Sequence, residues 1–125
     1  MRALSIQQPW AWLIVNGYKD GVENRSWPTN ERGERLIHAG KKVDAEGYEW
    51  VRETFPEIPL PPLEALERGG IVGRARLAAC VTSLASRWFF GPYGFVFEDP
   101  TPLPFMPLRG QLGFFDVPTH GETNG

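Results

Sequence analysis

A short charged segment, residues 17–27 (GYKDGVENRSW), contains the side chains best suited to chemistry. If it is extended, Lys19, Glu23 and Arg25 point to one side, because alternate residues of a strand share a face. They would then present two cationic donors and one carboxylate, a set that suits a planar nucleobase or a phosphate. The alternative is a surface ion-pair cluster on an edge strand, which stabilises a fold only slightly. Spacing alone leaves both interpretations open.

Aromatic side chains beside polar ones form a second candidate set. The chain has five tryptophans, of which Trp10 follows two glutamines and Trp27 follows Arg25 and a serine. An indole can stack on an unpaired base, and it can equally be an ordinary core side chain. Trp10 and Trp27 are therefore candidate stacking residues, and the alternative is that both are core side chains.

His38 lies between Ile37 and Ala39 in an apolar segment, so we expect a structural histidine. Near the charged segment it would alternatively act as an acid, a base or a hydrogen-bond donor. The chain has two histidines, too few for a histidine-based metal site. It also lacks the lysine-containing phosphate loop and the serine elbow of common nucleotide-binding and hydrolase folds. We expect neither a metal nor a cofactor.

The composition favours one small domain. A length of 125 residues with 42% apolar residues suits a single core. Cys80 is the only cysteine, which excludes an intrachain disulfide. The sequence has neither a signal-peptide pattern nor a stretch of about 20 apolar residues that would span a bilayer. We expect a cytoplasmic protein with no membrane partner.

Charge is distributed unevenly along the chain. The net charge of −2 argues against a protein that coats nucleic acid through bulk electrostatics. Residues 1–42 nevertheless hold seven Lys and Arg against four Asp and Glu, whereas residues 43–125 hold six against eleven. An anionic ligand should therefore prefer the first third of the chain.

Apolar periodicity and the positions of proline and glycine predict many short elements. Helices are expected within residues 8–17 and 43–55, with one helical turn at 63–67. Strands are expected at 2–7, 17–27, 35–40, 69–83, 94–99, 102–110 and 112–118. Gly73 marks a bulge or a close backbone approach in its strand.

These elements predict a single α+β domain over residues 1–118. Its expected architecture is a partly closed β-barrel of five or six strands with two or three short helices. Residues 119–125 have no apolar anchor and are expected to form a disordered tail.

Five segments resemble the ASCH family (activating signal cointegrator homology), small domains with a fold similar to PUA RNA-binding domains. They are LSIQQPWAWLIVNG, KDGVENRSW, RGERLIHAGKK, GGIVGRARL and DPTPLPFMPLRGQLGFF, which cover most of residues 4–115. The family signature, approximately G-x-K-x-x-E-x-R, begins here at Gly17. Four steps rather than three separate Lys19 from Glu23, and a bulge at Gly21 is expected to absorb the extra residue.

The resemblance implies a PUA-like fold with a cleft between the barrel and the first helix, able to hold a nucleobase, a nucleoside or RNA. Together with the aromatic and histidine candidates, the predicted ligand-binding residues are Gln8, Trp10, Gly17, Lys19, Glu23, Arg25, Trp27 and His38.

Three functions remain open. The first is binding of RNA, single-stranded nucleic acid or a modified nucleoside. The resemblance implies a second, because certain ASCH members look like amidohydrolases of N4-acylated cytidine and others are linked to RNA cleavage. Lys19 and Glu23 would then be the catalytic pair. The third is a protein-interaction domain, favoured only by the proline-rich segments, and fold resemblance alone does not decide among them.

Overall fold

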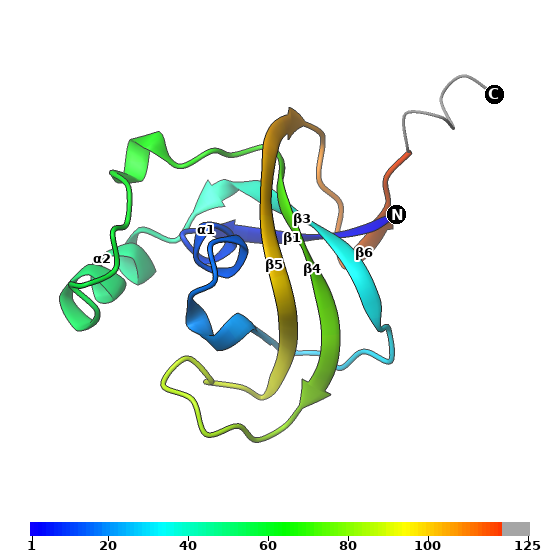
Figure 1. Ribbon diagram of the computed structural model, residues 1–125, viewed down its shortest axis with the longest axis horizontal. Helices are drawn as coiled ribbons and strands as arrows, with labels where there is room; N and C mark the ends of the chain where they lie inside the picture. Colours follow the sequence, from blue (N-terminus) through cyan, green and yellow to red (C-terminus); the bar gives the residue numbers. More distant parts are fainter. Residues whose placement is uncertain (119–125) are drawn as a thin grey trace.

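The computed structural model describes residues 1–118, in which six strands form one open sheet (Figure 1). The strands are β1 (Arg2–Gln8), β2 (Val22–Arg25), β3 (Gly33–Val43), β4 (Gly70–Val81), β5 (Tyr93–Pro107) and β6 (Phe114–Asp116). The helices are α1 (Trp10–Val15) and α2 (Ala45–Thr54), with 3-10 turns at Lys19–Gly21 and Leu63–Ala65. The tail predicted at 119–125 lies outside the described residues.

The sheet has the strand order β2-β5-β4-β3-β1-β6. β1 pairs in parallel with β3, and every other neighbouring pair is antiparallel. Figure 1 shows the sheet strongly curved, with α1 beside β5 at the end of β1 away from the N-terminus, and α2 at the opposite end of the long axis from the N-terminus. The predicted α+β class is confirmed, and the sheet does not close, consistent with a partly open PUA-like barrel.

Helix α1 supplies the centre of the core. Ala11, Leu13 and Ile14 have no solvent exposure and Val15 has 3%, as expected for a helix whose apolar residues extend around most of its surface. Burying each large aliphatic side chain contributes about 1.5–3 kcal/mol. Because α1 packs on the inner face of the sheet, it fixes the residues at its first turn relative to the strands.

The bulge predicted in β4 is confirmed. The pairing register of β4 with both neighbours shifts between Ile71 and Gly73. A Cβ at Gly73 would lie 2.6 Å from Cγ1 of Val15 and 2.7 Å from the carbonyl oxygen of Thr101. The backbone therefore approaches α1 more closely at this point than a larger residue allows.

The two strands predicted at 94–99 and 102–110 are one long strand, β5, so that prediction was wrong. Its prolines favoured an interruption, because proline removes a ladder donor. Within residues 1–118, however, β2 pairs only with Tyr93–Val96, and no strand pairs with the rest of β5 on that side. Proline is tolerated at such an edge, and Asp99, with φ of 52°, accommodates the local irregularity.

Candidate functional site

The charged segment is a tight turn followed by a short strand, so the prediction of a continuous strand through 17–21 was wrong. Residues Lys19–Gly21 form a 3-10 turn in which Lys19 and Asp20 have φ of 64° and 52°. Gly21, with φ of 71°, lies so close to the β5 backbone that a Cβ there would collide with the carbonyl oxygen of Phe97. This turn takes up the extra residue between Lys19 and Glu23.

The turn brings three charged side chains together. Nζ of Lys19 lies 3.7 Å from Oε1 of Glu23, and Nη2 of Arg25 lies 3.1 Å from Oε2 of the same carboxylate. The side chains of Lys19 and Glu23 are 3% and 11% exposed, so this group is not a solvated surface cluster. Two cations share one carboxylate, which leaves an excess positive charge beside a partly buried acid.

Lys19 is almost completely buried and lies against the first helix. Its Nζ is 4.8 Å from the centre of the Trp10 ring, within the range of a cation–π interaction. Burial lowers the pKa of the Lys19 ammonium below its ordinary 10.5, and Arg25 lowers it further, while Glu23 opposes both effects. The net result is an amine that loses its proton more readily than a surface lysine.

Folding stability should rise with pH because of Lys19. The pKa of Lys19 is lowered in the folded state, so between that value and 10.5 the unfolded chain binds more protons. We expect the free energy of unfolding of the wild type to increase relative to Lys19→Met as the pH rises from 7 toward 10.5. Urea denaturation of both proteins across this range measures the difference, and a difference that stays constant or changes with the opposite sign would contradict it.

Trp10 is held by the start of α2. Its Nε1 donates to Oδ2 of Asp44 at 3.2 Å, and Oδ1 of Asp44 accepts from the backbone N–H of Gly47 at 2.9 Å. Asp44 is thus the N-cap of α2, a role in which aspartate is strongly preferred. The same carboxylate fixes the helix and the indole, so the half-buried ring of Trp10 has a defined orientation.

Arg25 contacts strand β1, and Trp27 packs against β5 and β6. Nη2 of Arg25 donates to the carbonyl oxygen of Ser5 at 2.7 Å, while its buried Nε has no hydrogen-bond partner within residues 1–118. The Trp27 ring packs edge-on against Phe95 and Phe114, with ring centres 5.1 and 6.0 Å away. Trp27 remains half-buried and lies 5.9 Å from the guanidinium carbon of Arg25.

These residues surround a cavity of about 610 Å³, which we call the tryptophan cleft. Its walls are formed by Trp10 and Trp27, by residues of β1, β2 and β3, and by residues 111–113, which precede β6. The lining residues are Ser5, Gln7, Trp10, Glu23, Asn24, Arg25, Ser26, Trp27, Gly40, Lys41, Lys42, Gln111, Leu112 and Gly113. Among them are three cations and one carboxylate, so the cleft favours an anionic ligand with a flat, stackable part.

A smaller hollow of about 220 Å³ adjoins the cleft and is lined by Lys19, Trp88 and Phe90 together with three residues shared with the cleft. Asn24 positions its outer wall. The Asn24 amide nitrogen donates to the carbonyl oxygen of Trp88 at 2.9 Å, and its oxygen accepts from the N–H groups of Phe90 and Gly91 at 2.8 and 3.0 Å. Lys19 lines this smaller hollow and is not among the residues that line the tryptophan cleft.

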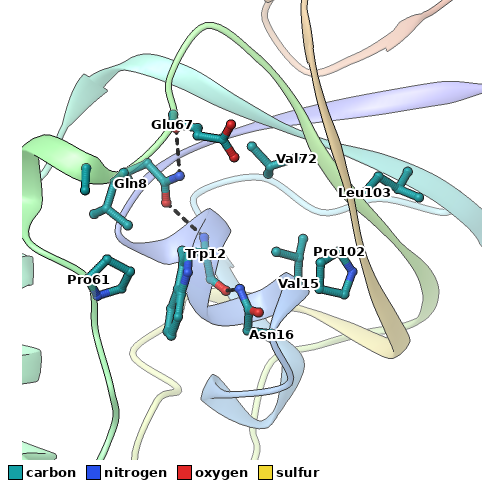
Figure 2. Close-up of a pocket in the computed structure, with 11 residues that line it drawn as sticks. Gln8, Trp12, Val15, Asn16, Pro61, Glu67, Val72, Pro102 and Leu103 are labelled. Carbon is teal, nitrogen blue, oxygen red and sulfur yellow. Dashed lines mark hydrogen bonds between the residues drawn. The ribbon is translucent and has the colours of Figure 1, made fainter.

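Gln8, a predicted site residue, lines a different cavity on the other side of α1, of about 420 Å³. Figure 2 shows its amide between Trp12 and Glu67. Nε2 of Gln8 donates to the carbonyl oxygen of Glu67 at 2.8 Å, and its Oε1 accepts from the backbone N–H of Trp12 at 2.9 Å. Its hydrogen bonds join β1, α1 and the segment before β4.

Gly17 and His38 also lie apart from the charged group. Gly17 ends α1 with φ of 85° and has open space where a Cβ would be, as is common after a helix C-terminus. His38 is 1% exposed. Its Nε2 lies 2.6 Å from the carbonyl oxygen of Leu108 and its Nδ1 lies 3.0 Å from Oγ of Ser5, behind the cleft wall.

Two features of the cleft were missed by the sequence reasoning. Lys41 and Lys42, both exposed, lie near the end of β3, the strand that carries His38. Two adjacent lysines in the first third of the chain were a sequence signal for an anion-binding surface. The hydrogen bonds by which Asn24 holds the segment 88–91 had no such signal, because these partners are more than 60 residues away in the sequence. No group of three or more metal-binding side chains gathers in the part of the chain that the structure describes.

The open six-stranded sheet, with a helix on its inner face and a charged turn beside that helix, gives an α+β fold consistent with a partly open PUA-like barrel. The sequence model of the ASCH domain matches residues 4–95, and the chain therefore belongs to the ASCH domain family. This membership is consistent with a nucleic-acid-binding role in general. A search of curated proteins found no match to the chain. Over residues 1–118, no helix is long and apolar enough to cross a membrane.

Proposed function

We propose that this ASCH domain binds RNA or another single-stranded nucleic acid by holding a nucleotide in the tryptophan cleft. The observation that carries the proposal is the position of Trp10 and Trp27, two half-buried indoles that line one cavity together with Arg25. An unpaired base can stack on an aromatic ring, and stacking of this kind contributes about 1–3 kcal/mol per base. Duplex RNA is instead recognised along its outer shape, and its paired bases do not present a free face to Trp10 and Trp27.

The polar groups of the cleft suit the remaining parts of a nucleotide. The side chain of Arg25 lines the cleft and is 19% exposed, so its guanidinium can donate to a phosphate or a base edge. Glu23 can accept from a base amino group, and Lys41 and Lys42 lie exposed at the mouth, where a phosphate would enter. Trp10 and Trp27 supply stacking surfaces in a cleft whose other lining residues are mostly polar, and convergent polar groups of this kind fix the orientation of a ligand. We keep a cytoplasmic location as part of this proposal, since a single cysteine forms no intrachain disulfide.

Replacing Arg25 by alanine should weaken RNA binding by about tenfold to a hundredfold, the loss of one charge-assisted contact of roughly 1–3 kcal/mol. The slope of log affinity against log salt concentration should also become shallower, because one fewer counterion is released. Fluorescence titration with a single-stranded oligouridylate measures both.

Arg74→Ala is the matched control, since Arg74 is an exposed arginine of β4 that does not line the cleft. It should reduce affinity far less than Arg25→Ala. Equal affinity of the Arg25→Ala and wild-type proteins, or no binding by the wild type, would refute the proposal.

A second candidate, hydrolysis of an N4-acylated cytidine, is favoured by the buried amine of Lys19. Its lowered pKa and its position next to Glu23 are what a proton-transferring or nucleophilic lysine requires. Lys19 contacts the small hollow, so an acyl group extending from a base in the cleft would have to reach that hollow. Release of acetate from N4-acetylcytidine that is abolished in Lys19→Met would support this candidate, and unchanged substrate would exclude it.

A further inference from the structure

A fourth cavity of about 450 Å³ lies beside the tryptophan cleft. The two hollows share five lining residues, Ser5, Gly40, Lys41, Gln111 and Leu112. They are therefore two parts of one depression, which begins at Trp10 and Trp27, crosses β1 and β3 at Ser5 and Gly40, and ends at Arg109. A ligand seated in the first hollow can continue into the second without leaving the protein surface.

The depression carries a row of cations along its length. Lys42 lines the first hollow, Lys41 lines both, and Arg109 lines the second. All three are exposed, and none has an ion-pair partner among the side chains that the structure describes. The second hollow has no acidic lining residue. An exposed row of unpaired cations along a groove is what tracking of a sugar–phosphate backbone requires.

Residues 108–112 form one wall of the depression, and a hydrogen bond joins this segment to the sheet. A carbonyl oxygen can only accept, so Nε2 of His38 carries the proton that it donates to Leu108 at 2.6 Å. Nδ1 of the same ring lies 3.0 Å from Oγ of Ser5, within hydrogen-bond distance. These bonds fix the segment that continues to Leu112, whose side chain is 99% exposed at the shared wall. An apolar side chain in that position is available for contact with a second base.

We infer that the ligand is a single-stranded oligonucleotide of at least two nucleotides rather than a free nucleotide. One base occupies the tryptophan cleft, and the backbone continues past Ser5 and Lys41 to Arg109, with Leu112 beside the next base. This inference rests on the proposed function and adds a second subsite to it. Arg109 accordingly acts only on ligands long enough to reach it, whereas Arg25 acts on every ligand.

The test compares uridine 5′-monophosphate with a hexauridylate on the full chain. We expect the hexamer to bind at least tenfold more tightly, and Arg109→Ala to weaken hexamer binding about threefold to tenfold while leaving the monophosphate unchanged, as for one lost phosphate contact. Arg25→Ala should weaken both ligands, and Arg74→Ala should affect neither.

The outcomes separate the two proposals. Equal affinities for the two ligands, or an Arg109→Ala protein that binds the hexamer as the wild type does, overturn the second subsite while the tryptophan cleft stands. Binding of neither ligand by the wild type overturns the proposed function and this inference together. Arg109 is exposed, so its replacement should leave folding unaffected, and a cooperative urea transition confirms this.

Discussion

Glu23→Gln is expected to lower the free energy of unfolding by about 3–5 kcal/mol at pH 7, as for other buried ion pairs that lose one partner. The Glu23 carboxylate is 11% exposed and lies between Lys19 at 3.7 Å and Arg25 at 3.1 Å. Glutamine keeps the shape of the side chain but leaves two cations without their shared anion. Because Lys19 is 3% exposed, water cannot replace the lost interaction. Urea denaturation measures the loss.

Glu34→Gln provides the control, because Glu34 is an exposed acid on β3 and its replacement should change stability by about 0.5 kcal/mol or less. Adding Lys19→Met to Glu23→Gln should restore part of the stability, because methionine removes a buried cation that has lost its counter-ion. If Glu23→Gln and Glu34→Gln are equally stable, the carboxylate does not stabilise the buried lysine, and the description of the turn is wrong.

Gly21→Ala is expected to be the most damaging single methyl addition in the charged segment. A residue other than glycine at positive φ costs about 1–2 kcal/mol, and Gly21 has φ of 71°. The added Cβ would also collide with the carbonyl oxygen of Phe97, and relief of such overpacking costs about a further 1–3 kcal/mol. The turn would have to move away from β5 and would take Lys19 with it.

Gly17→Ala separates the two contributions. Gly17 has φ of 85° but nothing within 4 Å of the added Cβ, so only the backbone cost applies. The difference in unfolding free energy between Gly21→Ala and Gly17→Ala should equal the cost of the collision. If the Gly21→Ala and Gly17→Ala proteins have equal free energies of unfolding, a Cβ at position 21 does not collide with the β5 backbone, which contradicts the described packing of the turn.

Local pattern was enough to predict the elements that have one clear period. Alternation placed β1 and most of β3 and β4, and apolar residues around most of the surface placed α1 as a buried helix. Prolines misled the prediction of β5, because their effect depends on whether a neighbouring strand pairs there. β2 ends after four residues, and nothing within the β5 segment itself reveals that length.

The charged group was predictable in part. The residue types of Lys19, Glu23 and Arg25 identified the segment, and the structure brings the three together. The turn that does so depends on Phe97, a residue far along the chain whose carbonyl excludes a side chain at position 21. Such a contact between distant segments has no local sequence signal.

Nearness in sequence was a poor guide to Gln8. It is two residues from Trp10, yet the start of α1 directs the two side chains to cavities on different sides of the helix. In Figure 2 the Gln8 amide lies among residues of the cavity that contains Trp12 and Glu67. Its two hydrogen bonds to backbone groups, which no sequence pattern shows, account for that orientation.

The central claim, that the tryptophan cleft holds a nucleotide of a single-stranded nucleic acid, is tested most directly by NMR of the indole N–H groups. The chain has five tryptophans, so each indole resonance can be assigned by single replacement. Titration with hexauridylate should shift the resonances of Trp10 and Trp27, which line the cleft, and leave Trp12 and Trp50, which lie outside it, in place. Unchanged Trp10 and Trp27 resonances at saturating RNA, or shifts confined to Trp12 or Trp50, would contradict the account.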